Sequence, residues 1–143
     1  MKRVPALMLV AWAVFVSSWF LPVHVGFRPY VEPGSGWSAF LIALRPSGSW
    51  LYKVLSISSA LSNGLMLFSV VILLARRPTQ RAPGWLAWGF VVATTVDLVW
   101  AFWRDHYEIS ALLVGYWSWV ASFGLSAVAL FSLRWRQAAA AAV

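Results

Sequence analysis

One acidic residue, Asp97, lies inside an apolar stretch of the chain, residues 92–100. A charged side chain at the centre of a bilayer costs about 2.5–3.5 kcal/mol on insertion scales, so such an acid should face other helices and have a partner. Counted from Trp103, Asp97 lies about 9 Å below the end of its helix, at 1.5 Å per residue. Asp97 is therefore the residue of this sequence best suited to bind a proton or a ligand.

Small polar side chains from other apolar stretches fall at a depth comparable to that of Asp97. Two interpretations follow from this layer. It is either a cluster of hydrogen bonds that holds helices together around one buried acid, or a water-accessible pocket that opens outward. Arg104 lies two turns beyond Asp97 on the same side of the helix and could reach back toward it. The pocket is predicted to comprise Asp97, Thr94, Ser56, Ser59, Asn63 and Tyr116.

Small residues follow one another at three- and four-residue intervals in the last apolar stretch. Small side chains let two helix backbones approach closely, so this face should contact another helix. That helix belongs either to the same chain or to a partner, and the sequence leaves both open. The predicted packing face comprises Gly115, Ser118, Ser122 and Ser126.

Histidines and catalytic motifs give little support for a metal centre or an enzyme. His24 and His106 both fall at the outer ends of apolar stretches, where an interfacial role is expected and not a haem or metal site. The chain has no cysteine, which excludes thiolate sites and disulfides. No paired carboxylates, zinc-protease motif, nucleophile elbow or phosphate loop occurs, so we expect no enzymatic activity and no cofactor.

The composition excludes a water-soluble fold. Of the 143 residues, 62% are hydrophobic and 10% are charged, and 11 are tryptophan. This leaves too few polar side chains to cover a soluble surface. The net charge is +7, but the basic residues lie at the ends of apolar runs, as in membrane proteins, so we expect a lipid bilayer as partner and not a nucleic acid.

The apolar runs predict an all-α membrane protein, an antiparallel bundle of four transmembrane helices in a single domain, residues 1–143. Each run is long enough to cross about 30 Å of hydrocarbon. The first run, with its basic start, also fits a signal peptide, but no A-x-A site follows it, which favours a retained helix. The expected spans are residues 4–23, 54–75, 85–103 and 109–133, with an outer loop at 24–50.

The outer loop contains a short amphipathic segment. Trp37, Phe40, Leu41 and Leu44 recur at helical spacing, and Ser35 is placed to cap the start. The segment is too short to span a membrane, so it predicts a short helix that lies in the outer interface.

The basic residues also predict orientation. Seven of them fall on one side of the expected bundle and four on the other, which puts the first side and both termini in the cytoplasm by the positive-inside rule. The membrane would be a bacterial inner membrane. The first set is Lys2, Arg3, Arg76, Arg77, Arg81, Arg134 and Arg136, and the second is Arg28, Arg45, Lys53 and Arg104.

Four strings of residues resemble those of a group of small bacterial four-helix membrane proteins. They lie at residues 18–23, 36–40, 61–65 and 115–123 and read SWFLPV, GWSAF, LSNGL and GYWSWVASF. The resemblance implies a fold and a topology but no activity. Small multidrug exporters resemble this chain poorly, because their essential acid is in the first helix and Asp97 is in the third.

Two functions follow as expectations. The first is a non-enzymatic inner-membrane protein that acts by helix–helix association, as an accessory subunit of a membrane complex or as a homo-oligomer. The alternative is a small transporter or proton-coupled carrier that uses Asp97 in an outward-facing polar pocket.

Overall fold

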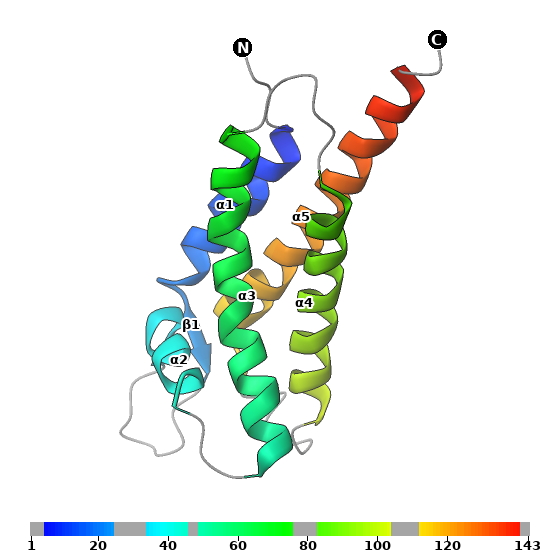
Figure 1. Cartoon of the computed structure of the whole chain (residues 1–143). Coiled ribbons are helices and arrows are strands. Elements are labelled where there is room, and N and C mark those ends of the chain that lie inside the picture. Colours follow the sequence, from blue (N-terminus) through cyan, green and yellow to red (C-terminus); the bar gives the residue numbers. More distant parts are fainter. Residues whose placement is uncertain (1–4, 25–33, 46–48, 76–82, 104–111, 141–143) are drawn as a thin grey trace.

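The chain forms a helical bundle with one short two-stranded ribbon, shown as a computed structural model in Figure 1. The structure describes residues 5–24, 34–45, 49–75, 83–103 and 112–140. In chain order the elements are α1 (Ala6–Ser18), β1 (Pro22–His24), β2 (Gly34–Ser35), α2 (Gly36–Ala43), α3 (Trp50–Ala75), α4 (Gly84–Trp103) and α5 (Val114–Ala140).

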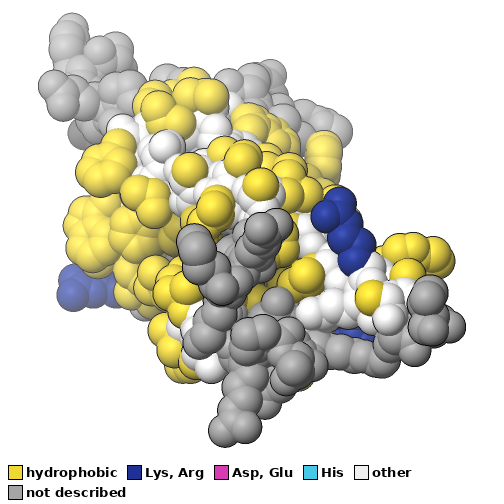
Figure 2. Space-filling model, turned by 90° about the horizontal axis from the view of Figure 1, so that it is seen from above, with side chains coloured by type: hydrophobic (Ala, Val, Ile, Leu, Met, Phe, Trp, Pro, Cys, Tyr) yellow, Lys and Arg dark blue, Asp and Glu magenta, His cyan; other side chains and the backbone are white. Residues whose placement is uncertain are grey.

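Three of these helices, α3, α4 and α5, are long and apolar enough to cross a membrane. They contain 26, 20 and 27 residues, and at 1.5 Å per residue even the shortest reaches about 30 Å. Their outward sides carry large hydrophobic side chains such as Leu61, Phe68 and Val92. In a view along the bundle, hydrophobic side chains are spread over the described surface, and Lys and Arg form only small patches (Figure 2). The chain is therefore a multi-pass helical membrane protein.

The first apolar run does not form one continuous helix. Helix α1 has 13 residues and ends at Ser18, whereas the expected span continues to Val23. Its last turn tightens, because the backbone N–H groups of Trp19 and Phe20 donate three residues back. Pro22 then disfavours helix at the residue before it, and the chain continues as β1. At about 20 Å, α1 alone is shorter than the hydrocarbon core.

The short helix expected in the outer loop is confirmed as α2. The Ser35 hydroxyl accepts the backbone N–H of Ser38 at 3.4 Å, which caps its start. Ser35 also ends β2, which pairs antiparallel with β1 so that Pro22 lies opposite Ser35. The position of α2 in the membrane interface stays a prediction.

Helix α5 begins at Val114 and continues seven residues past Leu133, where the last span was expected to end.

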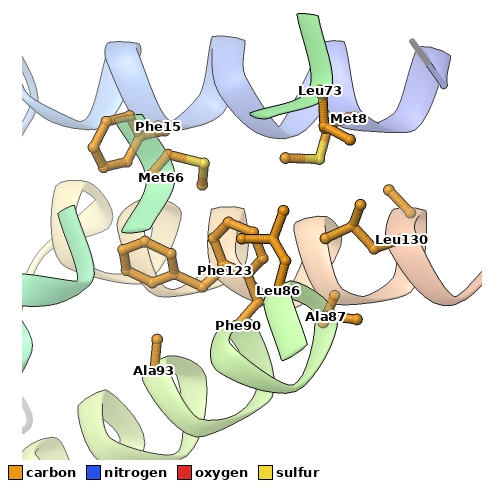
Figure 3. Packing of buried hydrophobic residues seen from close by; sticks show 12 residues of the cluster. Met8, Phe15, Met66, Leu73, Leu86, Ala87, Phe90, Ala93, Phe123 and Leu130 are labelled. Carbon is orange, nitrogen blue, oxygen red and sulfur yellow. The ribbon is translucent and has the colours of Figure 1, made fainter. Parts of the chain in front are cut away.

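Helix α5 is at the centre of the bundle, packed against α1 on one side and α4 on the other, while α3 packs against α4. Phe123 of α5 shows why, because its ring lies 6.1 Å from Phe15 of α1 and 6.2 Å from Phe90 of α4. Met66 of α3 and Leu130 of α5 fill the same core (Figure 3). The start of α1 and the end of α5 lie at the same end of the bundle (Figure 1).

Two glycines allow backbones to touch where β1 and α2 meet the bundle. A methyl group at Gly115 would lie 2.6 Å from the carbonyl oxygen of Pro22 and 2.8 Å from that of Leu21. A methyl group at Gly36 would lie 2.6 Å from the carbonyl oxygen of Ser18. Since these obstacles are backbone atoms, no side chain can move aside to make room.

Gly115→Ala should therefore destabilise the protein, by about 1–3 kcal/mol, the usual cost of overpacking. The matched control is Gly64→Ala, because nothing lies within 4 Å of the position that its methyl group would take. That control should be neutral or stabilise helix α3 by up to about 1 kcal/mol. Denaturation in detergent measures both, and equal stability of the two variants would contradict the packing described.

Candidate functional site

Asp97 is fully buried in the middle of the bundle. Its residue has 0% exposure, and neither carboxylate oxygen has a hydrogen bond of normal length and angle among the described residues. The hydroxyl of Ser59 on α3 faces the carboxyl group and interacts with it. Burial without paired donors is costly for a carboxylate, so Asp97 lowers the stability of the fold. A function of the acid would explain why such a residue is present.

Tyr116 of α5 contacts Asp97 through the backbone and not through the carboxyl group. Its hydroxyl donates to the backbone carbonyl of Asp97 at 2.6 Å. Its ring lies 5.7 Å from that of Trp100 and 5.8 Å from that of Trp119. Tyr116 therefore fixes α5 against α4 beside the acid and leaves the two carboxylate oxygens to other groups.

The side-chain oxygen and the side-chain nitrogen of Asn63 both form hydrogen bonds inside the bundle. Its side-chain oxygen accepts the indole N–H of Trp119 at 2.9 Å, and its amide nitrogen donates to the carbonyl of Ala60 at 3.1 Å. Asn63 therefore joins α3 to α5, and through Trp119 it adjoins Tyr116.

Two further residues of the predicted pocket bind elsewhere. Thr94 donates to the carbonyl of Phe90 in its own helix at 2.8 Å. Ser56 is buried, but its hydroxyl donates to the carbonyl of Ala43 at the end of α2, at 3.3 Å. The structure thus brings Asp97, Ser59 and Tyr116 together, and it gives Asn63, Thr94 and Ser56 other partners. Arg104, expected to reach toward Asp97, lies outside the described residues.

The face of small residues on α5 packs within this chain. Gly115 contacts the backbone before and at the start of β1, and Ser122 and Ser126 are fully buried. Their hydroxyls donate to the carbonyls of Trp119 and Ser122 at 2.6 and 2.8 Å, so they place no unpaired group in the core. Ser118 is half-buried. As α5 is packed here, Gly115, Ser122 and Ser126 are not open to a partner helix.

A second buried polar contact was not predicted. The indole N–H of Trp12 on α1 donates to the Ser69 hydroxyl on α3 at 3.1 Å, and Ser69 donates in turn to the carbonyl of Met66. The signal in the sequence was Trp12 itself, which lies near the middle of the expected first span, since a buried indole N–H needs an acceptor.

The side chain of His24 and all of His106 lie outside the described residues. Within the described part of the chain, no three His, Cys, Asp or Glu residues gather as a metal site would require.

Comparisons of the chain with protein-family models, with curated proteins and with solved structures found no match. The resemblance to small bacterial four-helix membrane proteins therefore stays a prediction. What the fold establishes is a small helical membrane protein with several candidate spans.

Asp97 and Asn63 should respond in opposite ways to loss of their polar groups. Asn63→Leu leaves the indole N–H of Trp119 without an acceptor and should cost about 1–2 kcal/mol. Asp97→Asn removes an acid that lacks normal hydrogen bonds, so stability should stay equal or rise. Thermal unfolding in one detergent compares the variants. A large loss of stability in Asp97→Asn would identify the acid as structural.

Proposed function

We propose that this chain is a small proton-coupled carrier in a bacterial inner membrane, with Asp97 as the group that takes up and releases the proton. The observation that supports this most directly is the full burial of Asp97 with neither oxygen in a normal hydrogen bond. Other buried hydroxyls of the bundle core donate to backbone carbonyls, in their own helix at Ser62 and Ser69 and in α2 at Ser56. An acid that occupies the core and makes no hydrogen bond of normal length and angle to the described residues is best explained by its chemistry.

The proposed topology has four crossings with both termini in the cytoplasm. In it, α1, the turn at residues 19–21 and β1 together make the first crossing. The position of the α1 start and the α5 end at one end of the bundle supports an even number of crossings (Figure 1). The excess of Lys and Arg that the sequence assigns to the side of the two termini supports a cytoplasmic location for it.

Association, as an accessory subunit or a homo-oligomer, is the second candidate function. Its surface would not be the small-residue face of α5, which is filled by the chain itself. The side of α3 that carries Leu61, Phe68 and Val71 favours this candidate, because it is exposed along the helix. No enzymatic activity is proposed.

Asp97→Asn should abolish proton movement coupled to a solute. Reconstituted vesicles with a pH-sensitive dye inside would be screened against a panel of small metabolites, with and without an imposed pH gradient. The wild-type chain should move protons when its solute is added, and Asp97→Asn should fall to the level of protein-free vesicles. The control is Thr95→Val, an exposed position on the same helix. Solute-dependent proton movement that survives Asp97→Asn would exclude the acid as the coupling group.

Native mass spectrometry of the gently extracted protein decides between the two candidates. The carrier proposal predicts a monomer, or a monomer with a bound small molecule. A reproducible hetero-complex, or a defined homo-oligomer that Leu61→Ala and Phe68→Ala weaken, would support association instead.

A further inference from the structure

A segment that we call the cap, made of β1, β2 and α2, lies beside the half of the bundle in which α4 finishes and α3 begins (Figure 1). Gly36, the first residue of α2, rests on the backbone of Ser18 and Trp19 at the end of α1. The cap thus begins where the helix of the first apolar run stops.

The cap covers the α4 and α5 side of the Asp97 site. Val23 of β1 is buried in a cluster with Ala101 of α4 and Tyr116 of α5. Ala101 is one helical turn from Asp97, and Tyr116 donates to the Asp97 carbonyl. The carbonyl of Val23 also accepts the backbone N–H of Leu113 at 2.8 Å, just before α5 begins.

The cap also covers the α3 side of the same site. The Ser56 hydroxyl donates to the carbonyl of Ala43, the last residue of α2. Ser56 lies about one turn from Ser59, whose hydroxyl faces the Asp97 carboxyl group. The contacts of the cap on α3 and on α5 therefore both lead, within one turn, to the same acid.

The opposite direction from Asp97 is closed by a dense apolar core. Met66, Phe90 and Phe123 are all 0–1% exposed and pack together there. The cap is far less buried, because α2 has no buried residue and its Trp37 and Ile42 are exposed. A segment with few buried apolar contacts opens locally at a lower free-energy cost than a packed core. Water would therefore reach Asp97 through the cap.

The groups that face Asp97 suit a proton. The carboxyl group faces the hydroxyl of Ser59, and Tyr116 is the titratable residue that interacts with it in the described part of the chain. A hard metal cation takes six or more oxygen ligands, which these residues do not supply.

We propose that the cap gates the aqueous route to Asp97: when β1 and α2 move away from Tyr116 and Ser56, a proton reaches the carboxyl group from the side of the cap. This inference rests on the proposed carrier function and specifies how its site is reached. The cap contacts the site through Val23, which packs against Tyr116, and the Tyr116 hydroxyl donates to the Asp97 carbonyl.

Locking the cap tests the proposal, and the cysteine-free chain makes this direct. Val23→Cys with Leu113→Cys is designed to join β1 to the residue before α5, at two positions already linked by a backbone hydrogen bond. The readout is modification of Asp97 in vesicles by a water-soluble carbodiimide and an amine, measured on the Asp97 peptide by mass spectrometry. Oxidation should slow the modification several-fold, and reduction should restore it.

The matched control is a disulfide within the cap, His24→Cys with Gly34→Cys, which joins paired positions of β1 and β2 and keeps the Ser35 hydroxyl that caps α2. It leaves the cap free to move as a unit, so the modification of Asp97 should stay at the wild-type rate. Equal rates in the locked and reduced forms of the first pair would overturn the gate, as would a wild-type Asp97 that the reagent never reaches.

A loosened cap gives the opposite expectation. Gly36→Ala pushes α2 away from Ser18 and should speed the modification of Asp97, while Gly64→Ala should not change it. An unchanged rate in Gly36→Ala would also count against the gate. Because this readout is chemical access and not transport, a carrier assay that fails leaves the test of the gate valid, and the reverse also holds.

Discussion

The constraint on which this structure depends is that polar groups inside a membrane bundle must find partners within the chain. Backbone groups meet it by forming helices. The buried residues Ser62, Ser69 and Ser126 meet it by donating to a carbonyl of their own helix. Trp12 and Trp119 meet it across helices, through Ser69 and Asn63. The carboxyl group of Asp97 differs from these groups, because neither of its oxygens has a hydrogen bond of normal length and angle to the described residues.

The same constraint explains the form of the cap. Once Pro22 ends the helical run, the backbone from Trp19 onward needs other hydrogen-bond partners. It obtains them from Trp37, from Leu113 and from the pairing of β1 with β2. The glycines at 36 and 115 let these backbones come close enough. The first helix therefore ends early, and the cap that follows it contacts α1, α3 and α5.

Much of the architecture follows from the sequence, because hydropathy and length are local properties. Helices α3 and α4 include the apolar runs at 54–75 and 85–103, although α3 begins four residues earlier, at Trp50, and Ser35 caps α2 as expected. The early end of α1 was missed, since an apolar run shows that a segment is buried but not that its backbone is helical throughout. The partners of the site residues were missed for another reason. Depth along a helix predicts which residues share a layer, whereas the rotation of each helix decides that Tyr116 meets the Asp97 carbonyl and Asn63 meets Trp119.

Asp97 lies between two regions that differ in how deeply their side chains are buried, the apolar core and the cap. Toward the core, Phe90, Phe123 and Met66 leave no room for water. Toward the other end, one helical turn separates the acid from residues that the cap covers, and α2 in the cap has no buried side chain. A group buried equally on all sides would gain little from titrating, because no proton could arrive. A group covered by a segment with few buried side chains can exclude water in one state and contact water in another. Alternating access to a proton site requires two such states.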